Sequence, residues 1–481
     1  MIPEIEFIKA VVRKLVGVEE DNIETLLNSQ SINWERFKEF INYHELTPFV
    51  YSLVKDFSSL LPLDLIEFLK NNHYCALVRC QGIRQEFLRI LTAFEQAEVM
   101  LLPLKGAALL EDIYIRMPLR LMTDIDFLVK EGDVEKGASI LYDAGYKKQL
   151  GGFTEEYWKQ DQCHITFVFK KENKLCVTEL HWGIDFKRKG RAILPEIWDR
   201  VREVNREGRA IKLLSPEDTL FSLALHARRF GKVLSLKNVY DAALLLNKYE
   251  KTFDWEYCLN VSKKYELCSA LFFILYQVEF LSGLNFYQRL MKELNVSKYK
   301  KKLIQNFIEK YTFLPDAQTQ RKKLYLKSHF LLYDTFKEPA NYILNIPQEQ
   351  FANYYGLNAY SRKANFFYKS RLFYMFFKVI SSFTANVKAF KAKEKDLDND
   401  LSFFETSGFS MWPFIKQGQK LIIKKILPES LKIGDIILYQ EDNQKVCHRL
   451  VKKVNKAINS CFIFVEIILY QRLSLSLRKC F

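Results

Sequence analysis

The sequence lacks the patterns of a secreted, membrane-spanning or zinc-binding protein. Its nine cysteines form no Cys-x-x-Cys pair, and its seven histidines show no paired spacing typical of a metal site. We therefore expect reduced thiols in a cytoplasmic protein rather than disulfides or a zinc site. The amino-terminal segment lacks the basic start and uncharged apolar core of a signal peptide. An uncharged apolar run of about 18 residues is missing as well, so no transmembrane helix is expected.

What the chain does contain is enough apolar surface for packed cores and a large excess of positive charge. Its 481 residues allow about two to four domains. Hydrophobic residues make up 49% and aromatic residues 15%, which excludes a disordered chain. The net charge of +15 favours anionic partners such as nucleotides, nucleic acid or an acidic membrane surface. A lysine-rich proteome explains the same charge, and the chain has no specific nucleic-acid-binding motif.

One stretch, residues 99–130, carries the clearest chemical pattern. An apolar run over 99–104 predicts a buried strand that ends at Lys105-Gly106, where the glycine allows a turn close to a ligand. A helix is expected over 107–114, followed by a second apolar strand that contains Asp124 and Asp126. Residues two apart on a strand point to the same face. Two carboxylates placed so close together indicate that a cation lies between them.

The order of these residues resembles a known family. Lys105-Gly106, Arg120 and the Asp124-x-Asp126 pair are followed by Glu179-Leu-His181-Trp182. From about residue 30 to residue 250 the chain is similar to the uncharacterised nucleotidyltransferase family of the DNA polymerase β superfamily. Two departures are that Lys-Gly stands where the superfamily usually has Gly-Ser, and that a longer segment precedes the aspartates.

The resemblance implies a metal-dependent transfer reaction and assigns its residues. Asp124, Asp126 and Glu179 would be catalytic and would hold two Mg²⁺ (or Mn²⁺) ions, and Glu179 would also help to deprotonate the acceptor. The substrate would be a nucleoside triphosphate, held by four residues: Lys105, Gly106, Arg120 and His226.

Several of these roles have alternatives. Glu179 is also consistent with a solvent-facing carboxylate on an edge strand, and Asp185 is a substitute for it. His226 is equally consistent with a packing histidine, and the same resemblance places Asp241 at the nucleotide cleft. His181 and Trp182 are expected to shape the floor of the pocket.

The fold class we expect is α+β, with several domains. Helical patterns cover residues 1–98, in which His44 is expected at a half-buried helix end. Residues 99–190 are expected to form the nucleotidyltransferase core, with a helix over 133–146 and a hairpin of 164–170 with 175–182. Residues 191–390 have helical patterns, with a helix start at Ser215-Pro216. A charged linker follows over 391–402, then a small β module over 403–454 and an atypical tail over 455–481.

The β module has a chemical pattern of its own. Ser410-Met-x-Pro413, Gly434-Asp435 and His448-Arg449 resemble, in this order, the signal-peptidase-like serine peptidases whose general base is histidine. Ser410 would attack the acyl carbon of a peptide, and His448 would accept and return its proton. Two features indicate that the module is truncated. Gly418 is followed by glutamine instead of the usual aspartate, and residues 458–481 contain neither glycine nor aspartate.

Three functions are therefore consistent with the sequence. The first is nucleotidyl transfer from a nucleoside triphosphate to an unknown hydroxyl or amine on a small molecule or peptide. The second is serine endopeptidase activity of the signal peptidase type, and the third is a non-catalytic binding or regulatory role. The basic and aromatic segment 366–383 is consistent with contact with an acidic membrane surface at the inner face of the membrane, or with a packed helix that has a basic exposed side.

Overall fold

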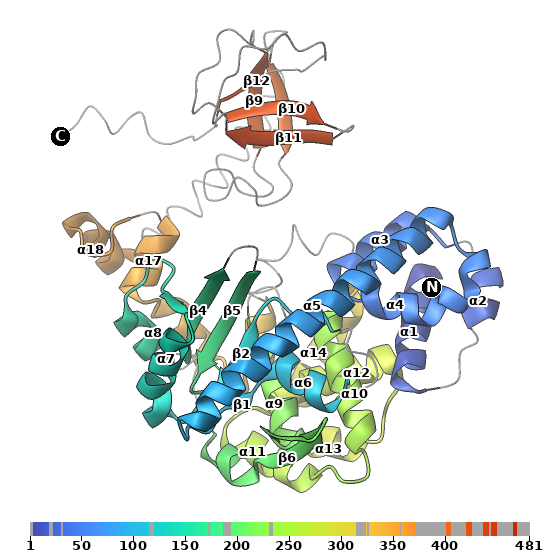
Figure 1. The fold of residues 1–481 in the computed structure, drawn as a ribbon, viewed down its shortest axis with the longest axis horizontal. Helices are drawn as coiled ribbons and strands as arrows, with labels where there is room; N and C mark the ends of the chain where they lie inside the picture. Colours follow the sequence, from blue (N-terminus) through green and yellow to red (C-terminus); the bar gives the residue numbers. More distant parts are fainter. Residues whose placement is uncertain are drawn as a thin grey trace. The chain divides into compact units, whose positions relative to one another are not determined.

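The computed structural model describes residues 3–18, 23–29, 32–114, 120–171, 174–185, 194–229, 234–313, 324, 327–355 and 357–371, and five strands near the carboxyl terminus. The chain forms two compact units, Met1–Leu372 and Phe373–Phe481. The first unit is mostly helical and contains one five-stranded sheet, whereas the described residues of the second are all in strands (Figure 1).

Helices in the described part of the first unit both precede and follow its sheet. Those on the amino-terminal side and within the sheet region are α1 (Pro3–Val16), α2 (Ile23–Ser29), α3 (Trp34–Tyr43), α4 (Thr47–Val54), α5 (Leu63–Gln96), α6 (Lys105–Asp112), α7 (Val134–Asp143) and α8 (Glu155–Asp161). Those that follow are α9 (Pro216–His226), α10 (Leu236–Tyr249), α11 (Trp255–Lys264), α12 (Cys268–Ser282), α13 (Gln288–Glu293), α14 (Lys298–Tyr311), α16 (Lys337–Leu344), α17 (Gln348–Tyr355) and α18 (Arg362–Lys369). Short 3₁₀ helices include η1 (Lys55–Leu60), η2 (Glu131–Asp133) and η4 (Pro195–Arg200).

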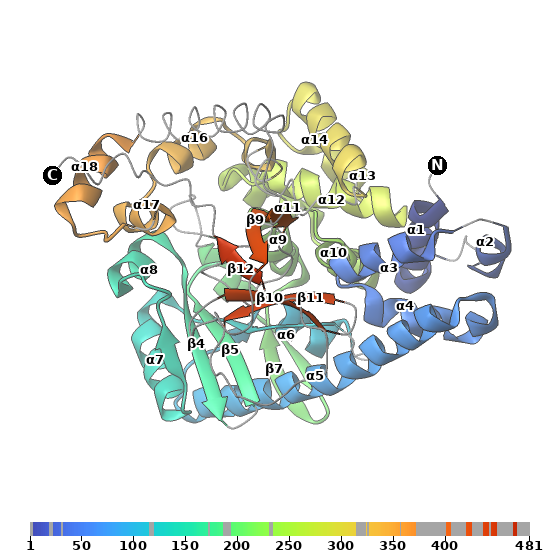
Figure 2. The ribbon, with the colours of Figure 1, turned by 90° about the horizontal axis from the view of Figure 1, so that it is seen from above.

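The sheet of the first unit has the strand order β1-β2-β5-β4-β3. Its strands are β1 (Leu102–Pro103), β2 (Ile125–Leu128), β3 (Lys147–Gln149), β4 (His164–Lys171) and β5 (Lys174–His181). Only the β2–β5 pair is parallel. Phe127 and Leu180, from these two strands, share a core with Phe94 of α5 and Leu141 of α7. In Figures 1 and 2, α5 runs along this sheet, and α7 and α8 lie beside β4. Side chains that alternate with this core face the other side of the sheet, where the candidate site lies.

The expected elements of the core are present, with shifted ends. The expected hairpin is confirmed as β4 and β5. The helix expected over 133–146 is α7, and Gly145, which follows its end, has a left-handed φ of 86°. The strand expected over 99–104 is paired only at Leu102–Pro103, at the edge of the sheet, where proline is tolerated. Asp124 lies just before β2 rather than within it, and α6 begins at Lys105, two residues earlier than expected.

The helical region after the sheet begins as expected. Ser215 caps α9, because its hydroxyl accepts a hydrogen bond from the Asp218 N–H. The prediction of helix is wrong for one part of this region. Those residues form a hairpin of β6 (Arg202–Arg206) and β7 (Arg209–Leu213). Its turn places Glu207 and Gly208 at positive φ (55° and 81°), the pair of angles that a two-residue hairpin turn requires.

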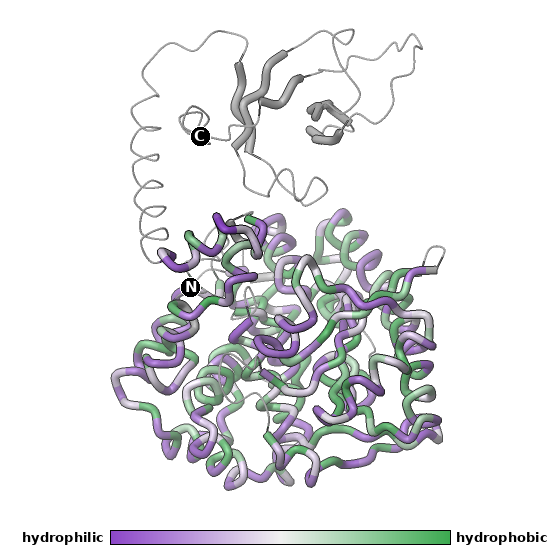
Figure 3. The backbone as a smooth tube through the Cα atoms, turned by 90° about the vertical axis from the view of Figure 1, so that its left-hand side faces the viewer, coloured by the Kyte–Doolittle hydropathy of each residue, from purple (hydrophilic) through white to green (hydrophobic). Residues whose placement is uncertain are grey.

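Hydrophobic and hydrophilic residues alternate along the helices of the first unit (Figure 3). This pattern matches helices that bury one face and expose the other. Within the described part of the chain, no helix combines the length and the apolar character needed to cross a membrane.

The second unit contains a five-stranded sheet of order β11-β10-β12-β9-β8. Its strands are β8 (Leu401–Glu405), β9 (Lys420–Lys425), β10 (Ile436–Glu441), β11 (Gln444–Arg449) and β12 (Val465–Ile468). β12 lies within the expected tail and pairs with both β9 and β10, so the sheet extends beyond residue 454. His448 lies on β11 opposite Ile437 of β10. Ser410 and the linker residues 391–400 lie outside the described residues.

Candidate active site

The parallel pairing of β2 and β5 brings together the acidic residues of the predicted site. Asp126 of β2 lies directly opposite Glu179 of β5, and Asp124 lies immediately before β2. The imidazole of His181, two residues beyond Glu179, contacts both strands: its Nε2 is 2.9 Å from Asp126 Oδ1 and 3.1 Å from Glu179 Oε2. Three carboxylates therefore meet at one corner of the sheet, although more than fifty residues separate the first from the last.

The three carboxylates have different electrostatic environments. Burial alone would raise the pKa of Asp126, but Lys105 and a hydrogen bond from His181 hold it well below its usual range. Burial also acts to raise the pKa of Glu179. The neighbouring His164 and His181 outweigh burial and lower this pKa to about 2. The pKa of Asp124 is raised, first by burial and then by the charges of Asp126 and Glu179. A cation near Asp124 would relieve this repulsion.

Lys105 is the closest cation to the acidic residues. Its Nζ lies 2.7 Å from Asp126 Oδ1, and both side chains are buried. Burial, together with the charge of Arg229, lowers the pKa of Lys105. Lys105 has a left-handed φ of 47°, and the preceding residue, Leu104, donates its N–H to the Asp126 carbonyl at 2.9 Å. A non-glycine residue in this conformation costs on the order of 1 kcal/mol, so the strained turn places the ammonium group against β2.

Gly106 has a different role from the one expected. The positive φ of the turn falls on Lys105, so Gly106 is not needed for the backbone angle. A Cβ atom at Gly106 would instead lie 2.2 Å from Arg120 Nη1 and 2.4 Å from Met122 Sδ. Only glycine lets α6 begin this close to the segment that leads into β2.

Arg120 is fixed by a buried pair with Asp241 of α10. Its Nε donates to both carboxylate oxygens at 2.9 Å, and its Nη2 donates to Oδ2 at 2.7 Å. The hydroxyl of Tyr114 donates to the same carboxylate at 2.7 Å. Asp241 thus holds the guanidinium at the wall of the site.

Arg120, Lys105 and the two aspartates of the segment around β2 line a cavity of about 290 Å³. Its lining includes six of the predicted site residues, namely Lys105, Gly106, Arg120, Asp124, Asp126 and His226. Glu179 is linked to them through His181 and through Arg229, whose Nη1 lies 3.4 Å from Glu179 Oε2. The volume is close to the lower limit of small-molecule pockets, about 300 Å³. Cationic and anionic side chains both line this small space, a mixture that suits a metal–phosphate ligand.

Three charged residues of the lining, Glu45, Arg229 and Lys237, are absent from the site predicted from the sequence. Lys237 forms an ion pair with Glu45 and donates to the Leu121 carbonyl at 3.1 Å. Lys237 precedes Asp241 by four residues on α10, so a helical-face pattern was the available signal. Glu45 follows the end of α3 with a left-handed φ of 58°, and no sequence motif marks it.

The two alternative acidic residues have different surroundings. Asp185 pairs with Arg228 at 2.8 Å, whereas Glu179 lies opposite Asp126, and neither of them belongs to the described lining of the cavity. His44, at the end of α3, accepts a hydrogen bond from the Leu236 N–H at 3.4 Å. It is fully buried rather than half-buried, and burial lowers its pKa to about 3. His44 is therefore a packing histidine.

Comparison with known proteins gives a result at the level of the family. No curated protein matches the chain. Among solved structures, one match is the crystal structure of the Megavirus polyadenylate synthase, with 14% sequence identity and a TM-score of 0.27; it covers 55% of this chain and 56% of that chain. The profile of the family described as "Uncharacterised nucleotidyltransferase" matches residues 30–282, which contain the entire cavity. The chain belongs to this uncharacterised nucleotidyltransferase family.

Proposed function

We propose that the first unit transfers a nucleotidyl group from a nucleoside triphosphate to a hydroxyl or amine of an acceptor. The observation that supports this most strongly is a cavity lined by Asp124, Asp126, Lys105 and Arg229, with Glu179 beside it in contact with Arg229. The amino-terminal end of α6 borders the same cavity. The partial positive charge of a helix amino terminus, together with nearby cationic side chains, attracts phosphate oxygens.

The residue types suit a divalent metal ion of the Mg²⁺ type, including Mn²⁺. Asp124, Asp126 and Glu179 offer the carboxylate oxygens that such ions prefer, and the charges of Asp126 and Glu179 add to burial in raising the pKa of Asp124. When bound, the ions would stabilise the charge that develops on the transferred phosphoryl group.

The protein's own side chains account for binding and orientation of the substrate. Lys105 and Arg229 are placed to neutralise phosphate charge, and Arg120 is held rigidly at the cavity wall by Asp241. A pKa of about 2 makes Glu179 a weak proton acceptor.

Turnover of a labelled nucleoside triphosphate with Mg²⁺ tests the proposal. We expect the purified protein to consume the nucleotide and the Asp124→Asn plus Asp126→Asn double variant to lose this activity. A matched control replaces two exposed aspartates, Asp56→Asn plus Asp143→Asn. Unchanged turnover in the site variant would reject the proposal. A Tm that does not respond to Mg²⁺ and nucleotide would instead favour the non-catalytic role.

A second proposed activity, serine endopeptidase chemistry of the signal peptidase type, belongs to the second unit. Its support is the antiparallel sheet of that unit, in which His448 lies on β11. A serine-directed phosphonate probe tests it on the full chain. We expect the probe to label the wild type but not Ser410→Ala, and equal labelling of both would exclude this activity.

A further inference from the structure

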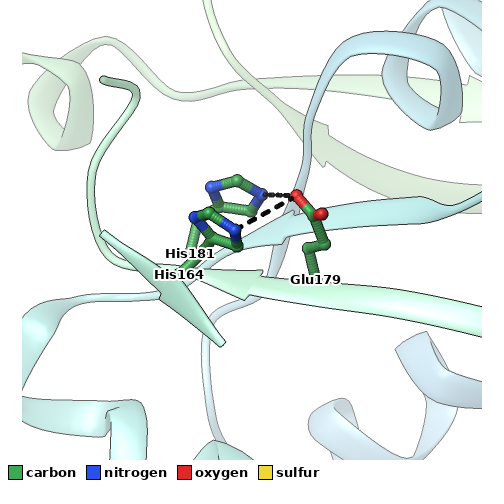
Figure 4. Close-up of side chains that lie close together, drawn as sticks. All are labelled: His164, Glu179 and His181. Carbon is green, nitrogen blue, oxygen red and sulfur yellow. Dashed lines mark hydrogen bonds and ion pairs between the residues drawn. The ribbon is translucent and has the colours of Figure 1, made fainter. Parts of the chain in front are cut away.

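Two histidines meet beside the acidic corner because of the β4–β5 hairpin. His164 begins β4 and His181 ends β5, and they are direct cross-strand partners in the antiparallel ladder. Their rings stack with centroids 4.9 Å apart and an interplanar angle of 25°. Glu179 is two residues before His181 and therefore points to the same face of the sheet. Figure 4 shows both imidazoles directed at the Glu179 carboxylate.

The three side chains converge on one oxygen atom. Glu179 Oε2 lies 3.1 Å from His181 Nε2 and 3.9 Å from His164 Nε2. One ligand atom from each residue lies within 4.8 Å of the others. In a tetrahedral zinc site with bonds of about 2.0–2.1 Å, neighbouring ligand atoms are separated by about 3.3 Å. Small side-chain rotations would therefore be enough to create the ligand spacing of a metal site.

The type of donor decides which metal fits. Two imidazole nitrogens and one carboxylate oxygen suit zinc and similar borderline ions, whereas an all-carboxylate set suits Mg²⁺. Three protein ligands would leave a fourth position open, as in catalytic zinc sites. All three residues are at most partly exposed, and the exposed fractions of His164 and His181 are 6% and 2%.

We propose that His164, Glu179 and His181 form a second metal site, which binds one borderline divalent ion such as Zn²⁺. The site differs in chemistry from the carboxylate set of Asp124, Asp126 and Glu179 but shares Glu179 with it. A metal ion on Glu179 Oε2 would replace the contact of that oxygen with Arg229, which lines the cavity. Zinc bound here would therefore compete with Mg²⁺ for Glu179. Binding of zinc itself does not depend on the proposed transfer reaction.

Zinc titration of the full chain against a chromophoric chelator tests the site. The background variant Cys75→Ser removes the exposed thiol of the first unit. We expect one Zn²⁺ per chain at this site. His164→Gln should lower the zinc affinity by about 100-fold or more, because even outer-shell partners of metal ligands contribute about 10- to 100-fold. Glutamine can still donate a hydrogen bond to Glu179, so a histidine that only positions Glu179 would be replaced without loss. His73→Gln, which removes an imidazole that contacts the Pro48 carbonyl at 2.9 Å, is the control and should leave zinc affinity unchanged.

Co²⁺ in place of Zn²⁺ identifies the ligands. A site of two imidazoles and a carboxylate gives weak visible bands without the strong near-ultraviolet band of thiolate ligation. Loss of the visible bands in His164→Gln would support the proposal. Equal zinc affinity in wild type and His164→Gln, or a thiolate band that persists in that variant, would overturn it.

A third measurement separates this proposal from nucleotidyl transfer. In zinc-free buffer, the Tm shift caused by Mg²⁺ and nucleotide should persist in His164→Gln. Asp124→Asn should weaken that shift while retaining zinc binding, since Asp124 is not among the zinc ligands. A wild-type protein that binds no zinc at this site but keeps its nucleotide response would overturn only the second metal site.

Discussion

Two buried carboxylates, Asp126 and Asp241, are bound by different cations, Lys105 and Arg120, and both cations line the cavity. Asp241 is saturated: the planar fork of Arg120 and the Tyr114 hydroxyl occupy its oxygens, and it is fully buried. Asp126 contacts the single ammonium of Lys105 and the imidazole of His181. An arginine fork is rigid and always charged, whereas lysine is a flexible point charge whose pKa falls readily on burial. Asp241 therefore has a structural role in fixing Arg120, while Asp126 can exchange its partners for a ligand.

The largest expected effect is on turnover. If Asp126 is the exchangeable carboxylate, Asp126→Asn should lower nucleotide turnover by at least about 1,000-fold, because the charge that would hold a metal ion is removed. Its effect on stability should be smaller than that of Asp241→Asn, since the remaining Lys105 has a lowered pKa and can become neutral. Labelled-nucleotide turnover and urea unfolding measure both quantities. Wild-type turnover in Asp126→Asn would remove the distinction between the two carboxylates.

The next effect concerns the saturated pair. Asp241→Asn should lower the free energy of unfolding by about 3–5 kcal/mol, because it leaves the buried Arg120 guanidinium without its counterion. Urea denaturation measures this loss. Replacing both partners with apolar residues, Arg120→Met plus Asp241→Leu, should restore part of the stability. A single variant within about 1 kcal/mol of wild type would contradict the structural role assigned to Asp241.

A smaller loss of stability is expected at Gly106, which lies between the Lys105–Asp126 and Arg120–Asp241 ion pairs. Gly106→Ala should cost about 1–3 kcal/mol in stability, because the new methyl group would overlap Arg120, which Asp241 prevents from moving. It should also reduce the Tm shift caused by Mg²⁺ and nucleotide. Gly82→Ala in α5 is the control, since a Cβ there would meet nothing within 4 Å. Equal stability and equal Tm shifts of the two variants would show that the close approach of α6 to Arg120 affects neither folding nor nucleotide binding.

The smallest effect has the opposite sign. The pKa of Asp124 is raised in the fold, so the folded state binds more protons than the unfolded state as the pH rises through the usual aspartate range, and stability falls there. Asp124→Asn should therefore raise the metal-free Tm at neutral pH, by about 1–3 °C, and remove this part of the pH dependence. Thermal unfolding between acidic and neutral pH measures it. A lower Tm for Asp124→Asn would show that Asp124 stabilises the metal-free fold.

Sequence patterns within a few positions of one another are sufficient to predict the secondary-structure elements and the acidic residues of this site. The β4–β5 hairpin, the cap at Ser215 and the acidic residues around β2 follow from side-chain alternation, turn residues and hydrogen-bonding groups within a few positions of one another. These signals are short-range, which is why they are legible in the sequence. The same reasoning predicted helix throughout the region that contains β6 and β7, because the Glu207-Gly208 turn was not recognised.

The partners of the charged side chains depended on the tertiary structure. Arg120 and Asp241 are 121 residues apart, and Lys105 and Asp126 are 21 residues apart across a strained turn. No two histidines have the sequence spacing typical of a metal site, yet strand register places His164 directly opposite His181. Sequence thus determined which ionisable groups are present and on which elements they lie. Only the packing of α10 and the parallel register of β2 with β5 decided which charges meet, because burial makes an ion pair depend on distance in space and not on separation along the chain.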